Sequence, residues 1–399
     1  MKRWFVGMTA IGLACGGDSS GPSAASVTGI AGDNQSAPQG ASLPVPLSFT
    51  ALGSDGLPIE GVSVTWSAIP TAAAAFTPTT APTDANGVAS TSVVLGSTVG
   101  QITIRATLAG VSPVNFHAIV LDPCEIITPY TIGQTVSAAL TTSDCLRQAW
   151  YYDYYQLDLP AGQQSLRLKM RGAGTFDDTF LDLYSAEALI LAFDDDSILG
   201  QEGARNSMLD IILPGDTSYV IGANSFDQFA TGNYTLSSEI RPATMNGCRQ
   251  VWVVRGVTVT DSIKATDCAD STSPAKYYDV ARIVGFATTV LTLNVRSTEL
   301  NPALGLYIFN PGSGARTHVL SNDDSLTGGG TNAYIRYTVP SNNFYDIIIS
   351  TSTGGEVGLY TFEVSASATL SPLMGRSAPK RREQGRWWRD VGLPKRSPQ

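Results

Sequence analysis

The sequence predicts an all-β protein built from three tandem β-sandwich domains. The segment 124–240 recurs one domain length later as 248–366, with the same landmarks in the same order. The chain of 399 residues contains 39 glycines and 22 prolines, which suits an architecture with many turns. Before the repeat, strands with alternating apolar and polar residues are separated by turn signals, as in a sandwich. The length is sufficient for several domains of ordinary size.

These features divide the chain into six segments. They are an export signal (1–15), a flexible linker (16–24), a first sandwich (25–120), a first repeat (121–241), a second repeat (246–368) and a basic tail (369–399).

The first fifteen residues have the composition of an export signal. Lys2 and Arg3 precede a short apolar run, which ends at Leu13 and is followed by Ala14 and Cys15. The pattern resembles a bacterial lipoprotein signal, and this resemblance implies that Cys15 is lipidated and becomes the mature N-terminus. The family prefers leucine three residues before the cysteine, where this chain has glycine. A plain secretory signal that is discarded together with Cys15 is therefore the alternative.

The other four cysteines form two pairs with nearly equal spacing. Cys124 and Cys145 are 21 residues apart, and Cys248 and Cys268 are 20 residues apart. In an exported protein both pairs are expected to form disulfides, each stabilising the fold by roughly 3 kcal/mol. A zinc site is disfavoured because the chain has no Cys-x-x-Cys and its two histidines lie far from either pair in sequence.

The first sandwich is predicted from its alternating strands and its turns. Leu47, Phe49 and Ala51 share one face of a strand, and Trp66 is expected in the core between the sheets. Segments 55–66, 83–90 and 114–116 together resemble the bacterial Ig-like domain of the invasin and intimin type. Such domains form stalks and adhesive rods, so the resemblance implies a spacer or adhesion role.

The two repeats resemble a second family, the bacterial pre-peptidase C-terminal domain. This jelly-roll-like β-sandwich is often appended to secreted proteases and is related to collagenase binding domains. The resemblance lies in segments 143–145, 152–155, 176–178, 194–196 and 232–234 of the first copy. In the second copy it lies in segments 266–268, 277–279, 322–324 and 358–360. In the second copy, segment 301–304 takes the place of the acidic segment 176–178, which precedes a strand in the first copy. Any function of the carboxylates in that segment is therefore expected to be absent from the second copy.

An acidic cluster in the first repeat is the candidate metal site. Its members are Asp177, Asp178, Asp194, Asp195 and Asp196, with Asp182 nearby in sequence. Carboxylate oxygens suit Ca²⁺ outside the cell. The alternative, which we favour, is that these aspartates cap turns and hydrate the surface. No cofactor is otherwise predicted, and the spacing is not that of an EF-hand.

A run of aromatic residues at 150–155 is the second candidate site. Side chains alternate between the two faces of a strand, so some of these rings could form an exposed platform for sugars or peptide. The favoured interpretation is that they fill the core on one face and cover the sheet on the other.

Catalytic machinery is not predicted. His117 and His318 do not belong to a recognisable motif with a nucleophile or an acid. The chain has no His-Glu-x-x-His and no phosphate-binding glycine loop, and paired carboxylates alone do not indicate a glycosidase. The net charge of −9 argues against a nucleic-acid partner.

The sequence thus predicts a noncatalytic lipoprotein of the bacterial cell envelope, attached to the outer membrane or cell surface by its N-terminal lipid, or otherwise secreted. Its Ig-like stalk presents two modules that bind an extracellular protein or polysaccharide. The alternative is an accessory or targeting subunit for a secreted hydrolase that is encoded separately. The basic tail is expected to be disordered and could touch an anionic surface.

Overall fold

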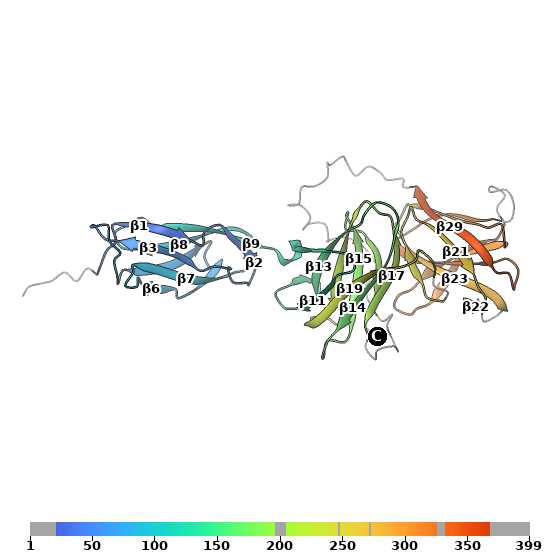
Figure 1. The fold of residues 1–399 in the computed structure, drawn as a ribbon, viewed down its shortest axis with the longest axis horizontal. Helices are drawn as coiled ribbons and strands as arrows, with labels where there is room; N and C mark the ends of the chain where they lie inside the picture. Colours follow the sequence, from blue (N-terminus) through green and yellow to red (C-terminus); the bar gives the residue numbers. More distant parts are fainter. Residues whose placement is uncertain (1–20, 196–204, 246–247, 271–272, 325–331, 368–399) are drawn as a thin grey trace, which may run out of the picture. The chain divides into compact units, whose positions relative to one another are not determined.

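The computed structural model describes residues 21–195, 205–245, 248–270, 273–324 and 332–367 (Figure 1). The chain divides into two compact units, one ending at Asp122 and the other beginning at Pro123. The predicted export signal with Cys15, the predicted basic tail and Asp196 lie outside the described residues.

The described residues are nearly all β, which confirms the predicted fold class. Their one helical element is the 3-10 helix η1 (Pro123–Glu125). In the described ranges, no helix is long and apolar enough to span a bilayer.

The first unit is a sandwich of two sheets. Its strands are β1 (Ser26–Ala31), β2 (Gln35–Pro38), β3 (Leu47–Leu52), β4 (Ser63–Ile69), β5 (Ala74–Thr77), β6 (Thr80–Pro82), β7 (Val88–Leu95), β8 (Gly100–Leu108) and β9 (Val114–Leu121). One sheet has the order β1-β3-β7-β5 and the other has the order β2-β9-β8-β4-β6. Trp66 lies between them, as predicted, with its ring 5.9 Å from Phe49 of the first sheet and 5.6 Å from Phe116.

A tight turn leads into β7, at a place where the sequence predicts one. The Asp84 carboxylate accepts hydrogen bonds from the backbone N–H groups of Asn86 and Val88. Gly87 has a φ of +70°, and a Cβ there would lie 2.7 Å from the carbonyl oxygen of Ala51. Only glycine satisfies both conditions.

The second unit contains both repeats. The strands of the first repeat are β10 (Ile127–Tyr130), β11 (Thr135–Leu140), β12 (Cys145–Arg147), β13 (Trp150–Asp158), β14 (Gln164–Gly172), β15 (Thr179–Ser185), β16 (Ile190–Asp194), β17 (Ser207–Leu213), β18 (Ser218–Ser225) and β19 (Gly232–Ile240). Those of the second are β20 (Val251–Val253), β21 (Thr258–Ile263), β22 (Cys268–Asp270), β23 (Ser273–Gly285), β24 (Val290–Arg296), β25 (Pro302–Phe309), β26 (Arg316–Asn322), β27 (Ala333–Thr338), β28 (Asn343–Thr351) and β29 (Gly358–Ser367).

Each repeat is a sandwich with the same strand order. In the first repeat, β10-β13-β18-β15-β16 packs against β11-β19-β14-β17; in the second, β20-β23-β28-β25-β26 packs against β21-β29-β24-β27. A buried tyrosine joins the two sheets at the same place in each copy. The Tyr234 hydroxyl donates to Asp153 over 2.6 Å, and the Tyr360 hydroxyl donates to Asp279 over 2.8 Å.

The two repeats share a sheet. Strand β20 pairs in parallel with β17 of the first repeat and with β23 of the second. A single hydrogen-bonded sheet therefore runs from one repeat into the other. The sequence indicates two consecutive modules, and the structure adds that they are fused through this three-residue strand.

The contact between the repeats is aromatic. Trp252 of β20 is buried, and its ring lies 5.4 Å from Phe193 of the first repeat and 6.2 Å from Phe344 of the second. Phe193 and Phe344 also meet each other, at 4.9 Å. Trp252 and Phe344 are buried and Phe193 is partly buried, so this contact is part of the hydrophobic core.

Both predicted disulfides are present. Cys124 is bonded to Cys145, and Cys248 is bonded to Cys268, so each links the start of a repeat to the short strand that precedes its long strand, β13 or β23. Structural disulfides persist in oxidising compartments, which indicates an extracellular or periplasmic location.

Candidate functional site

A groove of about 500 Å³ lies on the second repeat. It is formed on the outer face of the sheet by strands β23, β25, β26 and β28. Strand alternation creates this face: Tyr345, Ile347 and Ile349 of β28 point into the core, while Ile348 and Ser350 line the groove. The volume falls within the range of about 300–1,000 Å³ that is usual for ligand pockets.

Two tyrosine rings line the groove. A Cβ on Gly305 would lie 2.8 Å from the Cε2 atom of Tyr307, so the Tyr307 ring lies directly over the glycine. The Tyr307 ring also meets His318 in an edge-to-face contact, with centroids 5.3 Å apart. Tyr278 comes from β23, and its hydroxyl is 3.1 Å from the Sγ atom of Cys268. Both rings are therefore held by neighbours on their own sheet.

The groove is also lined by charged side chains, and their charges balance. Asp270 and Asp323 supply two carboxylates, and Lys276 and Arg316 supply two cations. Ser352 donates a hydrogen bond of 2.9 Å to Asp323, which fixes one carboxylate at the rim. The groove thus combines aromatic surface with hydrogen-bonding groups and has no large net charge.

A buried ion network positions Arg316. The Asp346 carboxylate is fully buried and accepts hydrogen bonds from Arg282 over 2.6 and 3.0 Å and from the Nε atom of Arg316 over 2.6 Å. The Arg282 guanidinium also lies over the rings of Phe309 and Trp252. The network connects the contact between the repeats to the groove.

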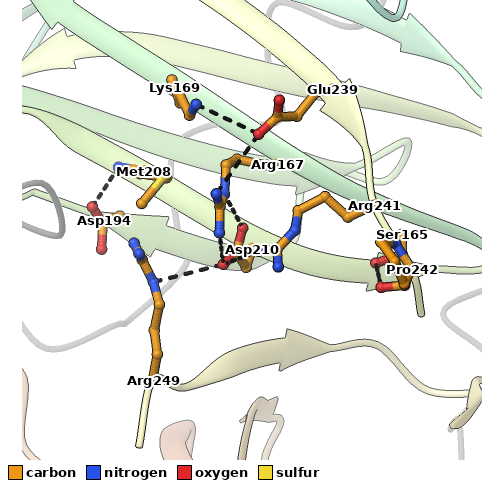
Figure 2. A network of polar contacts seen from close by, with 10 residues as sticks. All are labelled: Ser165, Arg167, Lys169, Asp194, Met208, Asp210, Glu239, Arg241, Pro242 and Arg249. Atoms are coloured by element: carbon orange, nitrogen blue, oxygen red, sulfur yellow. Dashed lines mark hydrogen bonds and ion pairs between the residues drawn. The ribbon is translucent and has the colours of Figure 1, made fainter. Parts of the chain in front are cut away.

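The first repeat has a comparable network around Asp210 (Figure 2). Asp210 is buried, and it accepts from Arg167 over 2.6 and 2.7 Å and from Arg241 over 2.7 Å. Burial by itself would raise the pKa of Asp210, but the two arginines outweigh burial and lower it. Arg249 lies 3.6 Å from the same carboxylate, and Glu239 lies 3.7 Å from Arg167. The network ties the beginning of the second repeat to the first, so we assign it a structural role.

The candidate calcium residues have separate protein partners. Asp194 accepts a hydrogen bond of 2.7 Å from the backbone N–H of Met208 (Figure 2). In the second repeat Asn322 accepts from the backbone N–H of Tyr334 at the corresponding place, so this contact does not require a negative charge. The buried Asp178 forms an ion pair of 2.7 Å with Arg205.

The other members of the acidic cluster do not complete a site in the described ranges. Asp177 is exposed, Asp195 is half-buried, and Asp196 lies outside the described residues. Within those ranges, no three His, Cys, Asp or Glu side chains come together to hold a metal ion. Calcium binding therefore stays a prediction.

The aromatic run at 150–155 is packed, in agreement with the favoured interpretation. Tyr154 and Tyr155 are buried, and Tyr152 stacks on Tyr154 with centroids 5.4 Å apart. Trp150 donates from Nε1 to the carbonyl oxygen of Phe226 over 2.9 Å. These rings cover the sheet of the first repeat and do not form a free platform.

The histidines have ordinary surroundings. In the first unit, Nδ1 of His117 lies 3.5 Å from a carboxylate oxygen of Asp33, and in the second unit His318 packs on Tyr307. Sequence reasoning did not find the groove, because its residues do not form a linear motif. A register-based comparison of the two repeats would have been needed to find it.

Asp153 should make stability depend on pH. Burial raises the pKa of its carboxyl from 3.8 to about 6, against the opposing effect of the Tyr234 hydrogen bond. Between these values the folded chain binds more protons than the unfolded chain, so the free energy of unfolding falls as the pH rises from about 4 to 6.5. Two pKa units correspond to about 3 kcal/mol at most.

Asp153→Asn should reduce this fall, since asparagine has no charge to desolvate and can still accept from Tyr234. The measurement is urea unfolding at several pH values, with Glu187→Gln, an exposed carboxylate in the same repeat, as the control. Identical pH profiles for wild type and Asp153→Asn would contradict the assignment.

Comparison with known proteins leaves the family open. No family model matches this chain, and no curated protein matches it. Solved structures with some likeness include the pre-peptidase C-terminal domain of a collagenase from Bacillus anthracis, with 14% identity and a TM-score of 0.22, over 29% of this chain and 95% of that one. The D0-D1 domain of intimin has 15% identity and a TM-score of 0.20, over 55% and 99% of the two chains.

A putative uncharacterized protein from Burkholderia cenocepacia has 10% identity and a TM-score of 0.21, over 59% and 82% of the two chains. The two families that the sequence resembles are thus represented among these structures. At such scores the likenesses carry no weight in the functional argument, which rests on the groove and the fold.

Proposed function

We propose that the protein is a noncatalytic component of the bacterial cell envelope that binds an extracellular protein or polysaccharide through its second unit. The groove on the second repeat is the observation that supports this proposal. It offers both aromatic and polar groups for contact with a ligand. In this proposal the first unit is a spacer and lipid on Cys15 attaches the chain to the outer membrane.

The test is binding of the purified, oxidised full chain to immobilised polysaccharides and matrix proteins, with calcium and with chelator. Saturable binding to one of them supports the proposal, and its loss on chelation would add a calcium site. If a folded chain binds none of them, the proposal is wrong. Co-purification with a secreted hydrolase, without such binding, would favour an accessory subunit instead.

Release from membranes tests the anchor. A wild-type chain that partitions into detergent, and a Cys15→Ser variant that does not, would support lipidation. Equal partitioning of the two would exclude it.

A further inference from the structure

The hydrogen-bond registers align the two repeats residue by residue. In the first repeat Asp153 pairs with Ala223, and in the second Asp279 pairs with Ile349. A register shift also interrupts the pairing of β15 with β16 at the same place as that of β25 with β26. The outer faces of the two sheets can therefore be compared position by position.

At three positions of the groove a smaller residue replaces a larger one of the first repeat, whereas Ile348 replaces Gly222. The equivalent pairs are Phe180 and Ala303, Asp182 and Gly305, and Phe193 and Ser321. In the first repeat the two phenylalanine rings stack at 5.8 Å, and Phe193 continues the contact to Trp252. The part of the face that is filled in the first repeat is thus hollow in the second.

Two tyrosines of the first repeat are retained in the second, and one of them loses its stacking partner. By register, Tyr278 is the equivalent of Tyr152, and Tyr307 is the equivalent of Tyr184. In the first repeat Tyr152 stacks on Tyr154, but the residue equivalent to Tyr154 is Val280. The second repeat therefore combines a hollow floor with an aromatic ring that has lost its stacking partner.

The chemistry of the groove favours an uncharged, hydroxyl-rich ligand. The C–H face of a sugar ring packs on aromatic rings, while each sugar hydroxyl both donates and accepts hydrogen bonds. The rim offers carboxylates, amide and hydroxyl groups for such bonds, and its two acidic and two basic side chains balance. The backbone groups of β25 and β28 in the floor are already paired on both sides, so an extended peptide cannot insert between these strands.

We propose that this groove on the second repeat is a binding site for an uncharged saccharide unit of an extracellular polysaccharide. The inference rests on the proposed function and makes it specific. It assigns binding to the second repeat alone, because the equivalent surface of the first repeat is filled by its own side chains and by Trp252.

The test is isothermal titration of the oxidised full chain with cellotetraose, maltotetraose and N-acetylchitotetraose. A heparin tetrasaccharide and a mixture of linear decapeptides are the comparison ligands. The variant Ala303→Phe/Ser321→Phe restores the ring pair of the first repeat, and it should weaken binding by roughly ten-fold or more. Tyr307→Ala should do the same by removing a ring. Leu359→Ser, an exposed residue on β29 of the other sheet, is the control and should bind like wild type.

Binding of a neutral tetrasaccharide that both groove variants weaken, with melting temperatures unchanged, supports the proposal. It is overturned if no neutral tetrasaccharide binds at millimolar concentration, if the groove variants bind like wild type, or if the charged sugar or the peptides bind best. A dimer that the same variants abolish would assign the groove to a second copy of the chain. If wild type binds a polysaccharide or protein and the groove variants bind it equally well, this site is refuted but the proposed function is not.

Discussion

Replacing Asp346 with alanine is expected to destabilise the second unit by about 3–5 kcal/mol, because it leaves a buried cation without its partner. Asp346 is fully buried and accepts two hydrogen bonds from Arg282. Only 7% of the Arg282 side chain is exposed. The guanidinium cannot turn to solvent, since it is enclosed by the rings of Phe309 and Trp252. Without the carboxylate, the desolvation cost of the buried Arg282 charge is no longer compensated.

The measurement is urea unfolding of the oxidised chain, followed by tryptophan fluorescence. Asp323→Ala is the matched control, because Asp323 is an exposed carboxylate at the edge of the same sheet and its removal should change stability by about 0.5 kcal/mol or less. A loss of less than about 1 kcal/mol in Asp346→Ala would show that water or rearrangement replaces the carboxylate.

A second variant distinguishes the effect of an unpaired buried charge on stability from the effect of lost packing. Arg282→Met/Asp346→Leu removes the carboxylate together with its more buried partner and keeps apolar volume, while Arg316, with 35% of its side chain exposed, can turn to solvent. The double variant should therefore recover much of the stability that Asp346→Ala loses. If the double variant is as unstable as the single one, the packing of Arg282 on the aromatic rings matters more than its charge.

Much of the fold could be predicted from the sequence because its signals are local. The cysteine spacing and the alternating strands each depend on a few neighbouring residues, and both disulfides and Trp66 lie where these signals place them. The fusion of the repeats could not be predicted in this way. Strand β20 is only three residues long, and a short apolar run contains no information about which distant strands lie on either side of it.

The groove escaped prediction for a related reason. Gly305 and Ser321 are ordinary residues in a β-rich sequence. That they leave space for a groove becomes visible only when they are compared with the equivalent, larger residues of the first repeat. For the acidic residues of the first repeat the situation is reversed. They are conspicuous in the sequence, but Asp178 and Asp194 contact the protein itself, Asp178 through Arg205 and Asp194 through the backbone of Met208.

Replacing Trp252 with alanine should loosen the two repeats from each other as well as destabilise the second unit. Removal of a buried tryptophan costs about 3–5 kcal/mol, and here the cavity opens between Phe193 of one repeat and Phe344 of the other. Cooperative unfolding of linked modules depends on the free energy of the contact between them. With that contact weakened, the repeats remain coupled by the pairing of β20, by the contact of Phe193 with Phe344 and by the ion pair of Arg249 with Asp210.

Calorimetry can distinguish these effects. We expect wild type to show one transition for the second unit and a separate transition for the first, and Trp252→Ala to split the former into two. Trp66→Ala is the matched control: it removes a buried tryptophan from the first unit and should move only that unit's transition. If Trp252→Ala lowers the transition of the second unit without splitting it, the remaining contacts between the repeats keep them cooperative, and the Trp252 side chain adds stability but no coupling.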